Sequence, residues 1–450
     1  MGARRAHRAG GVSHVTVRMP DPVRQTALWI LMRTETERRS MDGLLRTAAE
    51  SFEERDRRFL WMLVQETVRW RTRLDAVLVP LVTRPLSKLD ISVQVLLRMA
   101  ACQFCLLDQI PAHAIVDEGV RLARRFSSRG AERLVNAVSH RLAEDGRARF
   151  AQLDPTGDPH TWASGYSHPS WLIHRWRTRL GDELARTILE WDNHRPPIWL
   201  RARVDGPIPP GEPGWVPNTY RMPIGYRPTE DPLFEQGAWT AQDPGETLVG
   251  LLPPVTTGDA AILDLCSAPG TKTSHLCDRH EARVVAGDRT RARIQRVRAT
   301  MRRTGAHAEL VVADAIEVAF RPGSAAGVLV DAPCSNLGVL RRRVDARWNV
   351  RPTDLARHRR QQTRILNGAA VLPRVGGWLL YSVCSTEPEE TDGVRLSFLK
   401  AHPHFRPHPF AFDLSPEFMP EEGVLRILPG QGECDGVYAS LFKRIEEGTA

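Results

Sequence analysis

The sequence predicts an α/β domain built on a mainly parallel sheet and preceded by an all-helical domain. Apolar residues recur at helical spacing from about Asp21 to Leu142, whereas short apolar runs alternate with helix-length segments after Gln242. The chain has 450 residues, of which 42% are hydrophobic and 26% charged. Because one domain typically has roughly 100–200 residues, two or three folded domains are expected.

The helical domain is predicted over residues 20–148. Its helical spacing is clearest in RRFLWMLVQETVRW (57–70), VQVLLRMAACQFCLL (93–107) and AIVDEGVRLARRF (114–126). The polar segment that follows is rich in Gly, Pro and Asp, and we expect a linker at residues 149–165.

A small α/β subdomain is predicted over residues 166–240. SHPSWLIHRWRTRLGDELARTILEWDN (167–193) has a helical pattern, and PIWLRARV (197–204) has that of a strand. Trp171, Trp176 and Trp191 fall at helical spacing, so we expect them in the core and not on a base-stacking surface.

Residues 241–450 are predicted to form the α/β domain itself. The expected strands are AILDL (261–265), RVVAGD (283–288), ELVVAD (309–314), AGVLVD (326–331) and GWLLYS (377–382). Strands at this spacing indicate βαβ units, and therefore a parallel, doubly wound, Rossmann-like sheet. The first four strands end in Asp264, Asp288, Asp314 and Asp331, which should meet at one edge of the sheet. Any one of them could instead be a solvated residue at a strand end.

A cofactor site is predicted after the first strand, in DLCSAPGTKTSHL (264–276). A tight Gly/Pro turn followed by a helix brings backbone N–H groups to a ligand, and Asp288 suits hydrogen bonds to ribose hydroxyls. The phosphate-binding patterns GxGxxG and GxxxxGK[ST] are both absent. This combination favours a cofactor with ribose and adenine but no phosphate, as in S-adenosylmethionine.

The formal charge of +9 and the sequence pI of about 9.5 favour a polyanionic partner such as nucleic acid. Only four positive side chains are lysines, at positions 88, 272, 400 and 443. The arginine excess fits phosphate recognition, but it fits a GC-rich genome equally well.

Seven cysteines, an odd number without regular spacing, predict reduced thiols in the cytoplasm. The basic start MGARRAHRAGG runs into no apolar segment, and we expect no export signal and no membrane span. Cys102 and Cys105 form a CxxC pair inside an apolar helical run, so burial is expected. His113 and His275 have no ligand companions, and no metal is expected.

Three motifs resemble, in their order, those of the RNA cytosine-C5 methyltransferases of the NOL1/NOP2/Sun family: DLCSAPGTKTSHL, DAPCSNLGVLRRRVDARW (331–348) and YSVCSTEPEE (381–390). The resemblance extends to QDPGETLVGLL (242–252), DRTRARI (288–294) and DGVYASLFKR (435–444). The helical part is similar to the RNA-binding domain of the antitermination factor NusB in LRMAACQFCLLDQIPAHAIVDEGVRLA (97–123) and RLVNAVSHRL (133–142). Within the family, this fusion resembles the bacterial enzymes that act on 16S rRNA, which implies an RNA partner and, we expect, a monomer.

The resemblance implies a role for each of two cysteines. C5 of cytosine attacks a methyl sulfonium only after a thiolate has added at C6, and the C5 proton must then leave before the enzyme–base bond breaks. By resemblance Cys384 is the nucleophile, Cys334 assists product release, and Asp331 lies near both cofactor and base. The implied cofactor contacts are Cys266, Ser267, Ala268, Pro269, Gly270, Thr271, Lys272, Asp288, Arg293, Asp314 and Asp331. Phosphate contacts are expected from Arg341, Arg342 and Arg343.

Three positions depart from the family pattern. Thr271 stands where a second glycine is usual, so the loop must avoid a positive φ there or tolerate strain. Asn336 replaces a usual glycine, and asparagine is the other residue best able to adopt that conformation. Val344 replaces a usual proline.

Three other functions remain open from the sequence. One is a non-catalytic RNA-binding assembly factor, which would have no physical reason to keep both Cys334 and Cys384. The second is a cytosine methyltransferase acting on another RNA. The third is a DNA cytosine methyltransferase, whose nucleophile normally belongs to the fourth-strand motif.

Overall fold

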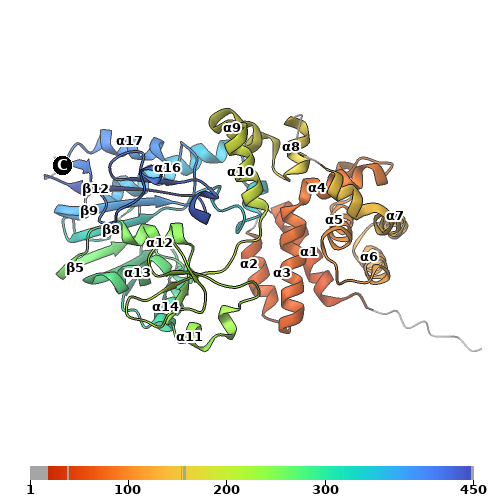
Figure 1. The fold of residues 1–450 in the computed structure, drawn as a ribbon, viewed down its shortest axis with the longest axis horizontal. Helices are drawn as coiled ribbons and strands as arrows, with labels where there is room; N and C mark the ends of the chain where they lie inside the picture. Colours follow the sequence, from red (N-terminus) through yellow and green to blue (C-terminus); the bar gives the residue numbers. More distant parts are fainter. Residues whose placement is uncertain (1–18, 38–39, 154, 156–158, 318, 447–450) are drawn as a thin grey trace, which may run out of the picture. The chain divides into compact units, whose positions relative to one another are not determined.

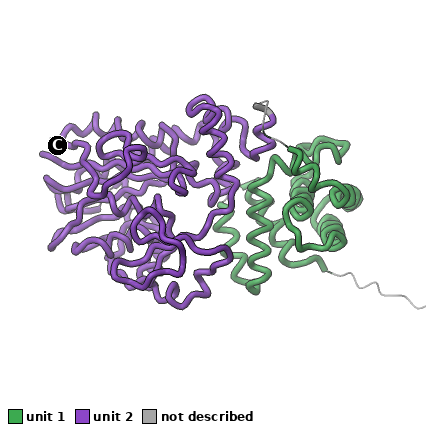
Figure 2. The backbone as a smooth tube through the Cα atoms, viewed as in Figure 1, with its two compact units in different colours: residues 1–156 green, residues 157–450 purple. Residues whose placement is uncertain are grey.

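The computed structural model describes residues 19–37, 40–153, 155, 159–317 and 319–446. It divides into two compact units, residues 1–156 and residues 157–450 (Figure 2). The basic start of the chain lies outside the described residues. In the described part, no helix is long and apolar enough to cross a membrane.

Unit 1 is helical throughout its described part. Its α-helices are α1 (Pro22–Glu37), α2 (Met41–Ala49), α3 (Glu54–Arg69), α4 (Arg71–Leu78), α5 (Ile91–Leu106), α6 (Ala112–Phe126) and α7 (Ala131–Gln152), with short 3₁₀ turns at Val79–Leu81 and Leu86–Lys88. Helix α5 is buried along most of its length and packs against α1, α3, α4, α6 and α7. It is therefore the centre of this unit's own hydrophobic core, and Cys102 and Cys105 are buried in it without forming a disulfide.

The predicted linker is partly helical, because α7 ends only at Gln152 and a short helix, α8 (Pro159–Gly165), follows. Unit 2 continues with α9 (Ser170–Leu180) and α10 (Asp182–Asn193). Trp176 of α9 is fully buried, as predicted, whereas Trp171 and Trp191 are only half-buried.

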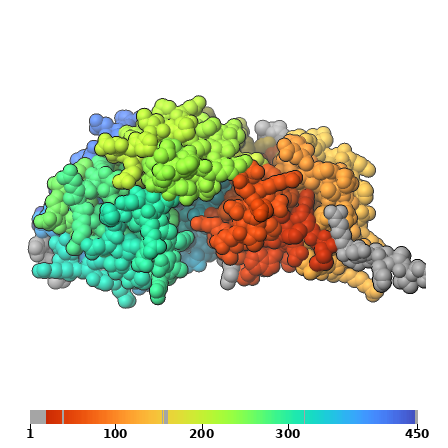
Figure 3. Space-filling model, turned by 90° about the horizontal axis from the view of Figure 1, so that it is seen from below, coloured from red at the N-terminus to blue at the C-terminus, as the bar shows by residue number. Residues whose placement is uncertain are grey.

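A small antiparallel sheet follows in unit 2, with strand order β2-β3-β1-β4. Its strands are β1 (Trp199–Ala202), β2 (Glu212–Pro213), β3 (Thr219–Arg221) and β4 (Trp239–Ala241); a 3₁₀ turn at Pro228–Glu230 and α11 (Pro232–Glu235) precede β4. Figure 3 shows the segment from about residue 200 to 240 lying against the segment near residue 300. There Arg303 donates to the carbonyls of Trp239, at 2.8 Å, and Phe234.

The main sheet has the order β10-β12-β9-β8-β5-β6-β7, with β11 paired to β12. Figure 1 labels its strands β12, β9, β8 and β5. Its strands are β5 (Thr257–Asp264), β6 (Glu281–Asp288), β7 (Glu309–Val312), β8 (Ala325–Asp331), β9 (Pro373–Val383), β10 (Phe405–Pro407), β11 (Val424–Ile427) and β12 (Val437–Arg444). The strands from β9 to β7 are parallel, and β10, β11 and β12 are antiparallel additions at one side. The predicted fold class is confirmed.

Helices cover both faces of this sheet (Figure 1). They are α12 (Pro244–Leu251), α13 (Thr271–Arg279) and α14 (Arg291–Thr304) on one side, with α16 (Pro352–Ala369) and α17 (Asp392–Ala401) on the other; α15 (Ala346–Asn349) lies in the loop before α16. Gly327 of β8 is required by packing, because a Cβ there would lie 2.0 Å from the ring of Trp378.

Candidate active site

The carboxyl edge of the parallel strands contains the switch point of the sheet. The chain runs outward from β5 to β6 and β7, and then returns to place β8 on the other side of β5. The loops after β5 and β8 therefore leave in opposite directions, which opens a crevice where open α/β sheets bind ligands. Both motifs singled out from the sequence begin here.

The loop from Cys266 to Lys272 is fixed by backbone contacts. The amide of Ser267 donates to the carbonyl of Gly287 at 3.0 Å, and the amide of Ala268 donates to Oδ2 of Asp288 at 3.1 Å. The Ala268–Pro269 peptide bond is cis, and Gly270 has a φ of +106°. Thr271 is already the first residue of α13, so the positive φ falls on the glycine before it and Thr271 avoids it.

Asp288 is buried at the end of β6, where its Oδ1 accepts from the amide of Arg289 at 2.7 Å and from Nε of Arg293 at 2.6 Å. Arg293 thus contacts Asp288, and Asp288 is the residue that faces the predicted cofactor site. Asp314 is exposed, with Oδ1 accepting from the amide of Ile316 at 2.9 Å. This set of carboxylates suits the hydroxyls and the ammonium group of the predicted cofactor.

Asp264 lies at the base of the loop and is 1% exposed. Thr273 donates to its Oδ2 at 2.7 Å, and its Oδ1 is a buried oxygen with no hydrogen-bond partner among the described residues. Burial raises the pKa of Asp264 to about 7, although the hydrogen bond from Thr273 opposes this. An unsatisfied acceptor at this depth fits a site that a polar ligand completes.

Lys272 joins two carboxylates of the crevice. Its Nζ donates to Oδ2 of Asp331 at 2.8 Å and contacts Oε2 of Glu246. Burial alone would lower the pKa of Lys272, but Asp331 and Glu246 raise it well above its usual value, so Lys272 is a cation. Burial raises the pKa of Asp331, and Ser382 donates to its Oδ1 at 2.8 Å.

Cys384 and Cys334 meet beside this group. The thiol of Cys384 donates to Oε1 of Glu246 at 2.7 Å. A hydrogen bond with Cys334, followed by burial and the Glu246 carboxylate, raises the pKa of Cys384 well above its usual value, and Lys272 opposes the shift. The thiol of this state is therefore protonated at neutral pH.

A buried carboxylate, Glu390, holds the two cysteine loops together. Its Oε1 accepts from the amide of Ser335 at 2.9 Å and from Gln362 at 3.0 Å. Its Oε2 accepts from the hydroxyl of Ser385 at 2.5 Å and from that of Ser335. Each serine directly follows one of the two cysteines, so this one side chain fixes both.

Close backbone contact completes the pairing of the loops. The amide of Gly338 donates to the carbonyl of Cys384 at 3.1 Å, and a Cβ at this glycine would lie 2.6 Å from the carbonyl oxygen of Gly436. Asn336 has a φ of +60°, the conformation predicted for it in place of glycine.

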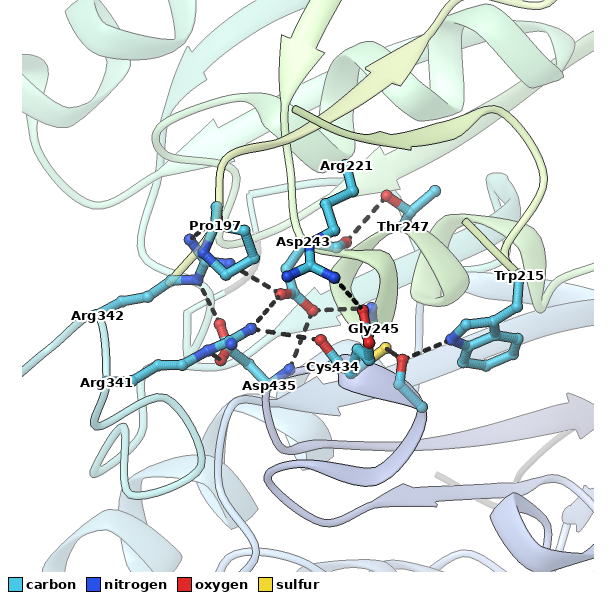
Figure 4. A network of polar contacts seen from close by, with 12 residues as sticks. Pro197, Trp215, Arg221, Asp243, Gly245, Thr247, Arg341, Arg342, Cys434 and Asp435 are labelled. Carbon is cyan, nitrogen blue, oxygen red and sulfur yellow. Dashed lines mark hydrogen bonds and ion pairs between the residues drawn. The ribbon is translucent and has the colours of Figure 1, made fainter. Parts of the chain in front are cut away.

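Arg341 is a correction to the predicted phosphate contacts. It is 1% exposed, and its guanidinium contacts Asp435, lies 3.4 Å from Asp243 and stacks 4.0 Å from the ring centroid of Trp191. Figure 4 shows it pointing into this polar network, together with Arg342. Arg341 is therefore a structural residue and not a surface contact for RNA.

Arg342 is partly exposed but contacts the same two carboxylates, at 3.0 Å from Asp243. Phosphate contact by Arg342 and by the half-buried Arg343 stays a prediction. Val344 is fully buried where a proline is usual.

Two functional candidates were missed from the sequence, Glu246 and Glu390. Both lie inside the quoted motifs, and Glu246 is the only acid in the apolar stretch from Pro244 to Leu251. That isolated charge was a usable signal, whereas the position of Glu390 beside two other acids gave none. Among the described residues no group of His, Cys, Asp and Glu could hold a metal ion.

Comparison with known proteins places this site in a family. The sequence model described as 16S rRNA methyltransferase RsmB/F matches residues 251–443, and the ferredoxin-like domain of the RsmF/B-like methyltransferases matches residues 168–204. The NusB family matches residues 21–144.

A curated relative from Bacillus subtilis (strain 168), "Probable ribosomal RNA small subunit methyltransferase B", is 30% identical over 94% of this chain and 98% of its own length. The solved structure "Crystal Structure of PH0851" has the same fold, with a TM-score of 0.72 at 23% identity over 95% of this chain and 100% of its own. NSun6 from Pyrococcus horikoshii, whose title names the ligand SFG, an analogue of S-adenosylmethionine, has a TM-score of 0.50 at 18% identity over 62% of this chain and 99% of its own. The chain therefore belongs to the RsmB/F family of S-adenosylmethionine-dependent rRNA methyltransferases, joined on its N-terminal side to a domain of the NusB family.

Proposed function

We propose that the protein methylates C5 of a cytosine in rRNA through a covalent bond between Cys384 and C6 of the base. The observation that supports this best is the pairing of the two loops that carry Cys384 and Cys334, which Glu390 joins through Ser335 and Ser385 at the switch point of the sheet. A methyltransferase acting on a nitrogen or a hydroxyl would need neither thiol.

Several residues of the crevice would bind the cofactor. The loop from Cys266 to Lys272 would hold S-adenosylmethionine together with Asp288, Asp314 and Asp331, and Arg293 would act by holding Asp288. When bound, S-adenosylmethionine supplies a methyl group on an electrophilic sulfonium.

The first chemical step is the addition of Cys384 to C6. The target cytosine must leave its stack to enter the crevice, as base-modifying enzymes require. Asp331 binds the N3 and amino edge of the base, and Lys272 stabilises the negative charge that develops on the ring. Both interactions favour addition and make C5 nucleophilic.

The last step is release of the methylated base. The C5 proton must be removed before the bond between Cys384 and C6 breaks. Cys334 lies beside Cys384 on the neighbouring loop and is the group we assign to this step, either as base or as the organiser of one.

We further propose 16S rRNA as the substrate. The relative from Bacillus subtilis is named as a methyltransferase of the small ribosomal subunit, and unit 1 belongs to the NusB family. The sulfur contacts do not distinguish one RNA from another, so this assignment depends on those names and on the domain fusion.

The decisive experiment uses Cys334→Ala with S-adenosylmethionine and unmodified 16S rRNA. We expect a protein–RNA adduct on a denaturing gel, because Cys384 still adds to the base but release fails. The double variant Cys334→Ala/Cys384→Ser is the control and should form no adduct. Mapping the cross-linked nucleotide identifies the cytosine.

Other outcomes would contradict parts of the proposal. If wild type methylates this RNA but Cys334→Ala gives no adduct, the assigned roles of the two cysteines are wrong. If wild type does not methylate it but methylates another rRNA, the 16S assignment is wrong.

A further inference from the structure

Glu246 is the acidic side chain nearest to the candidate nucleophile. It lies in the first turn of α12, and its side chain is 20% exposed. Its two oxygens are divided between two partners, because Oε1 accepts from the thiol of Cys384 at 2.7 Å and Oε2 contacts Nζ of Lys272. A carboxylate in direct contact with a thiol can take its proton.

The other groups around Cys384 are less suited to that task. Lys272 is already a cation held between Glu246 and Asp331, and so has no free acceptor. In Asp331, Oδ1 accepts from Ser382 and Oδ2 accepts from Lys272. Cys334 is itself a thiol. Glu246 thus combines an accepting oxygen with direct contact to the reacting sulfur.

The position of Glu246 is fixed by the helix that carries it. Asp243 caps α12, with Oδ1 accepting from the amide of Gly245 at 3.0 Å, and Asp243 is in turn held by Arg341 and Arg342 (Figure 4). Such anchoring suits a catalytic group, which must keep its distance to the sulfur.

We propose that Glu246 is the proton acceptor for Cys384 in the reaction. The inference rests on the proposed function. As the S–H bond breaks, its proton passes to Oε1 of Glu246, and the sulfur electron pair forms the bond to C6. The electrons of the C5–C6 double bond then become available at C5. Once C5 has bonded to the transferred methyl group, its proton passes to the base that Cys334 provides or organises. The C5–C6 double bond then re-forms, the C6–S bond breaks, and Glu246 returns its proton to the departing sulfur.

Glu246→Gln separates this role from a purely electrostatic one. The substitution removes a negative charge beside the thiol, so it lowers the pKa of Cys384 and makes the thiolate more abundant at neutral pH. If Glu246 acted by charge alone, methylation by the variant would be as fast as in wild type, or faster. If Glu246 is instead the proton acceptor, replacing it makes methylation slower.

The first measurement is single-turnover methylation of rRNA between pH 6 and 9. We expect Glu246→Gln to be about 100-fold slower than wild type at pH 7, within the range for general bases, and to recover as pH rises. Glu246→Asp should restore part of the rate. Glu281→Gln, an exposed carboxylate at the start of β6, is the matched control and should not differ from wild type.

The second measurement needs neither RNA nor cofactor. Alkylation of Cys384 by iodoacetamide, followed by peptide mass spectrometry, gives the pH at which this thiol ionises. The titratable groups that act on it are Glu246, Lys272 and Cys334, with Asp331 in contact with Lys272, and only Glu246 is changed. We expect the alkylation profile of Glu246→Gln to move to lower pH.

Methylation at pH 7 by Glu246→Gln at the wild-type rate or above would overturn the proposal. So would an unchanged alkylation profile, because the two side chains would then not be in contact. If wild type methylates no cytosine but the profile moves, the proposed function fails while the contact between Glu246 and Cys384 stands.

Discussion

Asp264 is a residue whose burial should be visible in the stability of the whole domain. Its pKa of about 7 in the folded state exceeds its ordinary value of 3.8, so the folded state keeps a proton that the unfolded chain has lost. The free energy of unfolding should therefore fall as pH rises from about 4 to about 7, by roughly 2–4 kcal/mol, and then level off.

Chemical denaturation at a series of pH values checks this expectation. Asp264→Asn should remove most of the decline, because the amide does not titrate. Asp259→Asn, an exposed residue on the same strand, should leave it intact. An equally steep decline in Asp264→Asn would show that another group is responsible.

Single residues also show what the sequence can predict and where it fails. The backbone conformations at Asn336 and Thr271 could be predicted, because the preference for a positive or negative φ is a local property of the residue type. The burial of Arg341 did not, because its partners Asp243 and Asp435 are far from it in the sequence. A run of arginines looks the same in sequence whether it faces solvent or two buried carboxylates.

At the scale of elements, Glu390 should control the pairing of the loops that carry Cys334 and Cys384. Glu390→Gln replaces one accepting oxygen by a donor, so the hydroxyls of Ser335 and Ser385 lose their shared acceptor. We expect the free energy of unfolding to fall by roughly 2–3 kcal/mol, as for other buried polar networks. Methylation should slow as well, because both thiols lose their fixed positions.

Thermal unfolding and single-turnover methylation test this pair of effects. Glu422→Gln, an exposed carboxylate before β11, is the control and should change neither. Normal methylation by Glu390→Gln would show that the loops are positioned without this contact.

The elements themselves were largely predictable. Each of the five apolar runs forms a strand. The inner strands must be apolar where helices cover both faces of the sheet, whereas β7, at the edge, is only partly buried. The short strands β2 and β10 were not predicted, since two or three residues leave no periodic pattern. The strand order that places β8 beside β5 depends on packing between distant segments. The contacts among Glu246, Lys272 and Cys384 depend on the same packing and could not be predicted either.

At the scale of the whole molecule, the excess positive charge should be concentrated where RNA binds. In unit 1 many arginines are paired with acids, as Arg98 is with Glu35 and Asp75. In contrast, Arg84, Lys88 and Arg129 are exposed, form no ion pair in the described part of the chain, and line one cavity of about 500 Å³ in which Asp90 is the one acid. Unpaired cations around a cavity favour phosphate contact.

We therefore expect the triple alanine variant of Arg84, Lys88 and Arg129 to bind rRNA more weakly and with less salt dependence. For single-stranded RNA, each lost phosphate contact reduces the slope of log K against log salt by about 0.7, so three reduce it by about 2. Filter binding between 50 and 300 mM salt measures this slope.

The matched control replaces Arg58, Arg124 and Arg147, three exposed arginines that are each paired with an acid, and so removes the same charge. If both variants lose the same slope, net charge and not this cavity determines binding. If only the variant of Arg84, Lys88 and Arg129 loses slope, the cavity in unit 1 holds the RNA backbone. The methylation rate of that variant at saturating RNA should then equal that of wild type.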